Sequence, residues 1–202
     1  MNHELSAVPS QRQRQRVATR NRLFDLCIDE FRRVGVEKTR IRDVVDRAGV
    51  VAGTFYFHFP TKSHVLLELG NRCIAEVARR LPGSSDAPPE LDELLRELAE
   101  ATIAVEDDLG DRDLMRAAVS SFQHPPADVP LASTQIQMAL RDCIAARVTR
   151  HDDDELSADE LSILILTSFF GALLVGPDAP DERARQLHRT LGFFARALRR
   201  SD

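Results

Sequence analysis

The sequence predicts an all-α fold of about nine helices. Apolar residues recur at spacings of three and four along most of the chain, which is the period of an amphipathic helix. The alternation of apolar and polar residues that is typical of a half-buried strand is absent, and only 9 of the 202 residues are glycine. A chain of this length can bury a sizeable core as one domain or as two small ones.

The first helix is expected to start near Ser10 and to run to about Val34. Ser10 and Gln13 have the spacing of a capping box, in which each side chain bonds to the backbone N–H of the other residue. The apolar stripe of this helix consists of Leu23, Phe24, Cys27, Ile28 and Phe31.

Residues 39–62 predict two short helices joined by a tight turn. Thr39 is the expected N-cap of the first helix, Gly49 ends it, and the second helix starts near Val51. The shared core is expected to contain Val44, Ala48, Phe55 and Phe59. Two short helices around a glycine turn describe a helix-turn-helix, whose second helix can enter the major groove of DNA.

Six further helices are expected downstream. Their approximate ranges are 61–81, 86–109, 114–122, 130–150, 157–175 and 180–200. Ser157 and Glu160 form a second capping box. The helix that they open is apolar on nearly every face, so it must be covered on all sides.

Several runs in the N-terminal region together resemble the DNA-binding signature of TetR-family transcriptional regulators. They are Phe31, Gly35, Ala48-Gly49-Val50, Gly53-Thr54-Phe55-Tyr56, His58-Phe59, Thr61-Lys62 and Leu66. The resemblance is specific over about residues 20–70 and only architectural beyond them. It implies a helix-turn-helix domain with a basic N-terminal arm over 1–60, and a helical domain for effector binding and dimerisation over 61–202.

The resemblance also implies which residues of the helix-turn-helix contact DNA. Hydroxyls of Thr54 and Tyr56 are expected to reach base edges or phosphates. The residues expected to bind phosphates are Thr39, Arg40, Arg42, His58 and Lys62. Val51, where the family often has a serine that caps the helix, Ala52 and Phe57 leave an apolar recognition surface that favours thymine methyl groups. An alternative interpretation of this surface is a ligand-binding or interaction module that has lost operator specificity.

Charge is divided unequally along the chain. The net charge is −5, but residues 1–62 hold 12 Lys and Arg against 7 Asp and Glu, a net charge of +5, and the remainder carries −10. A basic N-terminal part attracts phosphate, while an acidic remainder keeps the DNA contact local. The Gln-Arg repeat at 11–16 is either a solvated helix end or an arm that follows the DNA backbone or enters a minor groove.

The last two helices carry more apolar surface than one subunit of this size readily covers. A homodimer built on a four-helix bundle would cover it, and two heads would then recognise a pseudo-palindromic operator. The interface is expected to include Leu164, Phe169, Ala172, Leu187, Leu191, Phe194 and Leu198. The alternative is that both helices are the internal core of a monomer.

By the same resemblance, residues of about 88–150 form a pocket for an unidentified small-molecule effector. The candidates mix apolar and polar groups, as ligand pockets do, and are Met115, Phe122, His124, Gln135 and Met138. At helical spacing the same residues also fit an ordinary core and surface. An effector that opposes operator binding would make the protein a ligand-released repressor, although activation or a protein partner also fits the sequence.

Other classes of function find little support in the sequence. Three scattered cysteines favour a reducing cytoplasm, and no signal peptide is expected. The most apolar run, 161–175, falls short of a membrane span. We expect no enzyme, no cofactor and no metal site, because His151-Asp152-Asp153-Asp154-Glu155, the one faint metal candidate, fits a solvated acidic loop.

Overall fold

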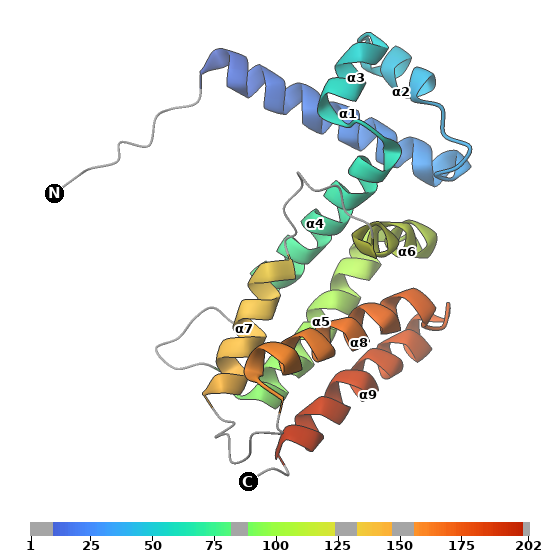
Figure 1. The fold of residues 1–202 in the computed structure, drawn as a ribbon. Coiled ribbons are helices and arrows are strands. Elements are labelled where there is room, and N and C mark those ends of the chain that lie inside the picture. The colour runs from blue at the N-terminus through green and yellow to red at the C-terminus, as the bar shows by residue number, and fades with distance from the viewer. Residues whose placement is uncertain (1–9, 82–88, 124–132, 147–155, 200–202) are drawn as a thin grey trace, which may run out of the picture. The chain divides into compact units, whose positions relative to one another are not determined.

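The computed structural model describes residues 10–81, 89–123, 133–146 and 156–199 (Figure 1). These residues form nine α-helices and one short 3-10 helix, and no strand occurs among them. The predicted all-α fold is confirmed. The chain divides into two compact units, Met1–Val65 and Leu66–Asp202.

Helix α1 (Gln11–Val34) begins at the predicted capping box. The Ser10 hydroxyl accepts from the backbone N–H of Gln13, and the Gln13 side chain accepts from the backbone N–H of Ser10 at 2.7 Å. Residues 11–16, which the sequence left open as an arm, are the exposed first turns of this helix. The chain leaves the helix at Gly35, whose φ of 85° lies in the region that favours glycine.

Helices α2 (Ile41–Ala48) and α3 (Ala52–His58) are the two arms of the helix-turn-helix. Gly49 joins them in the left-handed conformation, with φ 66°. The predicted core is confirmed, because each of its members is at most 2% exposed: Val44, Ala48, Phe55 and Phe59. The expected absence of a side-chain cap at Val51 is also confirmed.

The predicted N-cap of α2 is wrong. Arg40, not Thr39, occupies that position, and no side chain caps the helix. Thr39 is 5% exposed, and its hydroxyl donates to the carbonyl of Gly35 at 2.9 Å. The hydroxyl thus closes the turn after α1 as a donor and does not cap the N–H groups of α2.

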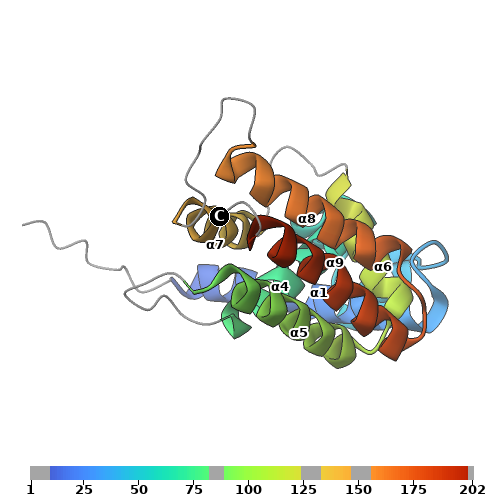
Figure 2. The ribbon, with the colours of Figure 1, turned by 90° about the horizontal axis from the view of Figure 1, so that it is seen from below.

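The second unit is a helical bundle. Its helices are α4 (Lys62–Arg80, which starts in the first unit), α5 (Leu91–Leu109), α6 (Arg112–Ser120), η1 (Ser121–Gln123), α7 (Ser133–Ala145), α8 (Ala158–Val175) and α9 (Pro180–Arg199). Helix α9 packs along α5 and α8, while α6 and α7 pack against α8 (Figures 1 and 2). The capping box of Ser157 and Glu160 is present at the start of α8.

Most residues expected at the dimer interface are instead covered by their own chain. Phe169, Ala172, Leu187 and Leu191 are at most 7% exposed, and Phe194 and Leu198 pack against the same core. Helix α5 covers this stripe of α9, a partner that sequence periodicity does not identify. Of the expected set, Leu164 is exposed, at 44%.

Helix α8 has a second, outward face. Ile163 is 52% exposed and Val175 82% exposed, although the opposite side of the helix lies in the core. By length and composition alone, α8 could cross a membrane: its mean hydropathy is 1.8 and a third of it is buried. This is weak evidence for a span, since the core helix of a soluble protein has the same properties.

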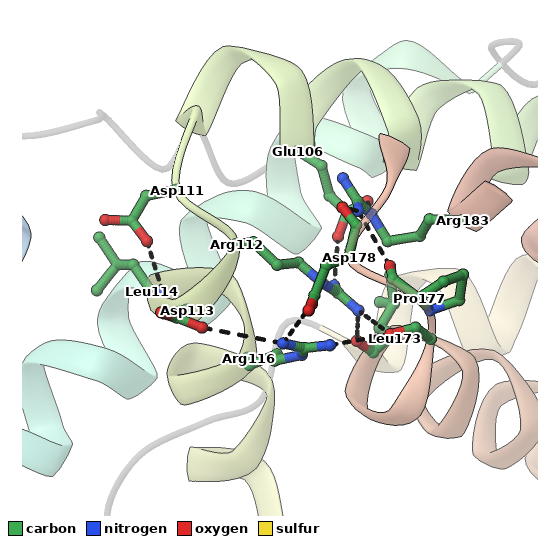
Figure 3. Close-up of polar contacts among 11 residues, drawn as sticks. Glu106, Asp111, Arg112, Asp113, Leu114, Arg116, Leu173, Pro177, Asp178 and Arg183 are labelled. Carbon is green, nitrogen blue, oxygen red and sulfur yellow. Dashed lines mark hydrogen bonds and ion pairs between the residues drawn. The ribbon is translucent and has the colours of Figure 1, made fainter. Parts of the chain in front are cut away.

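A buried ion network joins α5, α6 and α9 (Figure 3). Glu106 of α5 is 7% exposed and accepts from Arg112 of α6 and from Arg183 of α9, both at 2.8 Å. Arg183 also donates to the carbonyls of Pro177 and Asp178. One carboxylate therefore pairs with guanidinium groups from two other helices.

The same network caps the C-terminus of α8. Arg112 donates to the carbonyl of Leu173 at 2.5 Å, and Arg116 donates to the carbonyl of Gly176 at 2.9 Å. A Cβ at Gly176 would lie 2.4 Å from the carbonyl oxygen of Ala172, so only glycine fits there. Cations from α6 thus satisfy carbonyl groups that have no partner inside α8.

Candidate functional site

The helix-turn-helix is held on α1 by a buried carboxylate. Glu30 is 2% exposed and accepts from Arg33 of its own helix and from Arg47 of α2, the latter at 3.4 Å. The hydrogen bond from Arg33 is the main cause that lowers the pKa of Glu30 below its usual value. The carboxylate therefore stays ionised and fixes α2, and with it the turn into α3.

Helix α3 presents an exposed face that is mainly apolar. Val51, Tyr56 and Phe57 are 74%, 52% and 64% exposed, and Ala52 beside them is exposed as well. Thr54 is only half-buried. A short helix whose inner side is core and whose outer side is free can enter a major groove.

Lys62 lies at the start of α4, where it holds the turn that follows α1. Its ammonium donates to the carbonyls of Val36 at 2.7 Å, Glu37 at 3.1 Å and Thr39 at 3.4 Å. Three acceptors satisfy the three donors of an ammonium group. The geometry gives Lys62 a structural task that the sequence did not suggest.

Two more residues that were expected to bind phosphate, both arginines, are at the surface. Arg40 is exposed, and Arg42 is exposed with Asp46 at 3.8 Å. Such an exposed pair is weak and leaves Arg42 available to a stronger anion. Thr39, by contrast, is buried with its hydroxyl engaged, and we leave it out of the proposed interface.

Two arginines of α1 lie on aromatic rings of the helix-turn-helix, and sequence reasoning missed both. The guanidinium carbon of Arg16 is 4.8 Å from the ring centroid of Phe57, and that of Arg20 is 4.6 Å from the ring centroid of Phe59. A signal was present, because Arg16 ends the Gln-Arg repeat and Arg20 follows it one helical turn later. The expected base-reading residue Phe57 thus has a cation on one face.

An apolar cavity of about 30 Å³ lies within the second unit. Its lining comes from α4 to α8 and consists of Gly70, Cys73, Ile74, Val77, Val105, Met115, Val119, Phe122, Ile136, Phe169, Phe170 and Leu173. Of the expected effector residues, Met115 and Phe122 line it, whereas Met138 is 49% exposed and does not. His124 and the side chain of Gln135 lie outside the described residues.

Phe122 fills one side of this cavity. Its ring lies so close to α4 that a Cβ at Gly70 would approach two ring atoms to 2.6 Å. It also contacts the ring of Phe170, with 5.9 Å between centroids. Burial raises the pKa of the Cys73 thiol to about 11, so this wall is uncharged as well. The space therefore suits apolar groups.

No group of three His, Cys, Asp or Glu side chains that could hold a metal occurs among the described residues. The expected acidic loop His151-Asp152-Asp153-Asp154-Glu155 lies outside them.

The fold and the exposed α3 face define the class of helix-turn-helix DNA-binding proteins. Comparison with known proteins agrees for this part of the chain: residues 24–69 match the model of "Bacterial regulatory proteins, tetR family". The match identifies residues 24–69 as a TetR-type DNA-binding domain.

Relatives support the same assignment. Over 51 residues the chain is 37% identical to the "Probable acrEF/envCD operon repressor" of Escherichia coli K12, and the same repressor of strain O157:H7 matches equally. The matched part is 25% of this chain and 23% of that repressor.

Solved structures extend the likeness of fold to most of the chain. Thermus thermophilus FadR, a TetR-family transcriptional repressor solved with lauroyl-CoA, gives a TM-score of 0.65 at 21% identity over 87% of this chain and 92% of FadR. A TetR regulator from Rhodococcus sp. RHA1 gives 0.63 at 19% identity, over 89% and 97%. At such identities the likeness concerns the fold alone.

Proposed function

We propose that the protein is a cytoplasmic repressor that binds a pseudo-palindromic operator as a homodimer and is released by a small apolar effector. The exposed face of α3 carries the proposal of operator binding. Val51, Ala52, Tyr56 and Phe57 stand on its outer side, whereas the inner side is core. Tyr56 can hydrogen-bond to a base edge, and the apolar groups favour thymine methyls.

The dimer would form through the outward face of α8 and its neighbour α9. Ile163, Leu164 and Phe193 are 52%, 44% and 60% exposed, which is unusual for large apolar side chains grouped on packed helices. Gly171 of α8 faces open space, because a Cβ there would meet no atom within 4 Å, so a partner helix can approach closely. Leu164→Asp should therefore yield monomers in light scattering, whereas Met138→Asp, at an exposed position of α7, should leave dimers.

The effector would bind in the cavity around Phe122. At about 30 Å³ the cavity holds little more than water, while ligand pockets measure roughly 300–1,000 Å³. Displacement of the Phe122 ring from Gly70 would open it. Because Gly70 belongs to α4, the helix that continues from the DNA-binding unit, a ligand that displaces Phe122 also changes what packs on α4.

The lining supports an effector with an apolar chain or ring. Every lining residue is apolar or a neutral thiol, so a charged ligand would lose its hydration without gaining a partner. Fatty acyl chains are a suitable first probe, and FadR, which shares the fold, was solved with an acyl-CoA. By reciprocity, such a ligand must bind the operator-free protein more tightly than the operator complex.

Selection from a random duplex library with the purified protein tests operator binding. Recovery of a palindromic motif, bound less tightly by Tyr56→Phe, would support the proposal. Tyr56 is the only tyrosine and the chain has no tryptophan, so its fluorescence reports the same contact directly. A folded dimer that enriches no motif would refute operator binding and favour a ligand-binding module without operator specificity.

A further inference from the structure

Arg16 is an unneutralised cation at the edge of the recognition helix. It is exposed, and no ion pair joins it to any residue that the structure describes. Its guanidinium lies over the exposed ring of Phe57, which fixes its position although no carboxylate holds it. A stacked guanidinium keeps its N–H edge free to bind an anion in a defined direction.

One more arginine and a histidine lie close to the Arg16 guanidinium. Arg20 follows Arg16 by one turn of α1 and lies over the ring of Phe59. His58 ends α3, with its ring 5.2 Å from that of Phe57 and nearly perpendicular to it. Burial and then the charges of Arg16 and Arg20 lower the pKa of His58.

Two guanidinium groups of α1 thus act on the imidazole at the end of α3. Two guanidinium groups beside one imidazole favour a positive local potential, which attracts an anion. A phosphate would reverse this effect, since it accepts hydrogen bonds from the guanidinium groups and favours the protonated imidazole. The ligand chemistry that fits the region is therefore a phosphate monoanion.

We propose that Arg16, held on the Phe57 ring, forms with Arg20 and His58 a seat for one DNA backbone phosphate beside the groove that α3 enters. The inference rests on the proposed operator binding and extends the contact surface to α1. It also assigns a different role to Phe57, which holds the guanidinium in place and leaves the reading of bases to its neighbours on α3. One face of the ring is occupied by Arg16, so a thymine methyl cannot use that face.

The test uses the operator selected by the wild-type protein. Arg16→Ala should weaken binding about tenfold, the effect of losing one charge-assisted hydrogen-bonded contact. It should also lower the slope of log affinity against log salt by about one unit. Arg14→Ala is the matched control, because it removes the same charge from an exposed site on the same helix, where no ring stacks.

Operators with single methylphosphonates locate the phosphate. Neutralising the phosphate in the seat should weaken wild-type and Arg14→Ala binding about tenfold. It should weaken Arg16→Ala binding clearly less, because only Arg20 and His58 remain to contact that phosphate. Arg16→Lys should keep the salt slope but lose affinity, because an ammonium lacks the planar stack. The double variant Arg16→Ala/Phe57→Leu should bind no worse than Arg16→Ala alone.

Two results would overturn the seat. In one, Arg16→Ala keeps the full methylphosphonate profile of the wild type; in the other, it changes affinity and slope no more than Arg14→Ala does. Arg16 is exposed, so thermal melting should show that its variants are folded. If the wild-type protein selects no motif, the proposed operator binding is wrong. The selection step shows this before any variant is tested.

Discussion

Replacement of Glu106 by glutamine tests the ion network in the second unit. The side chain keeps its shape but loses its charge, and two guanidinium groups then remain buried without a carboxylate. Their side chains are 14% exposed for Arg112 and 8% exposed for Arg183, against 5% for Glu106. Removing one partner of a buried ion pair costs about 3–5 kcal/mol, because the other charge stays desolvated.

This cost should appear as a lower melting temperature. For a chain of this size, 1 kcal/mol corresponds to roughly 2–4 °C, so Glu106→Gln should melt roughly 6–12 °C below the wild type if about 3 kcal/mol is lost. Circular dichroism at fixed protein concentration measures the shift, and urea unfolding gives the free energy. The retained carbonyl oxygen of glutamine can still accept one hydrogen bond, which favours the lower end of the range.

Two further variants provide reference values for the loss of unfolding free energy. Asp178 pairs with Arg116 at 2.7 Å but is 79% exposed, so Asp178→Asn should lose at most about 1 kcal/mol. Arg183→Met leaves Glu106 paired with Arg112 and should fall between the two. If Glu106→Gln melts no lower than Asp178→Asn, the network does not hold the helices together and the reasoning is refuted.

Three other predictions follow from the contacts described. Gly70→Ala should lose about 1–3 kcal/mol of unfolding free energy, because its Cβ meets the Phe122 ring, and Phe122→Ala in the same chain should restore part of it; equal effects of Gly70→Ala in both backgrounds would contradict the contact. Lys62→Met should lower the stability of the DNA-binding unit by about 1–3 kcal/mol and leave the salt slope of operator binding unchanged, whereas a lost phosphate contact would lower that slope by about one unit. Lowering the pH from about 7.5 to about 5.5 should raise operator affinity through His58, because a bound phosphate favours its protonated form; over the same range the free protein should lose stability, since the depressed pKa lets the unfolded chain bind the proton first. Titrations with His58→Gln, which should show neither trend, check this last prediction.

The local signals in the sequence were sufficient to locate most helices. The capping boxes at Ser10 and Ser157 are present as expected, since their bonds join residues only three apart. The core of the helix-turn-helix also follows from spacing, because Phe55 and Phe59 share one helical face. At Thr39 local reasoning failed: the hydroxyl can accept from N–H groups that follow it or donate to a carbonyl that precedes it, and periodicity does not decide between them.

Contacts between helices could not be predicted in this way. Leu187 and Leu191 form an apolar stripe whether α5 or a second subunit covers it, and the structure places α5 there. The cavity likewise depends on residues from five helices and on the close approach of Phe122 to Gly70. Periodicity shows which face of a helix is apolar but does not identify the partner.

The sequence by itself determined the all-helical fold, the helix-turn-helix and its apolar recognition face, because these depend on residues within one or two turns of each other. The tertiary structure decided what each charged group does. It placed Lys62 on three carbonyls, Arg112 and Arg183 on Glu106, and Arg16 on the Phe57 ring. The physical reason is the length of these side chains: a lysine or arginine reaches across to another element, and its partner is set by the packing of helices.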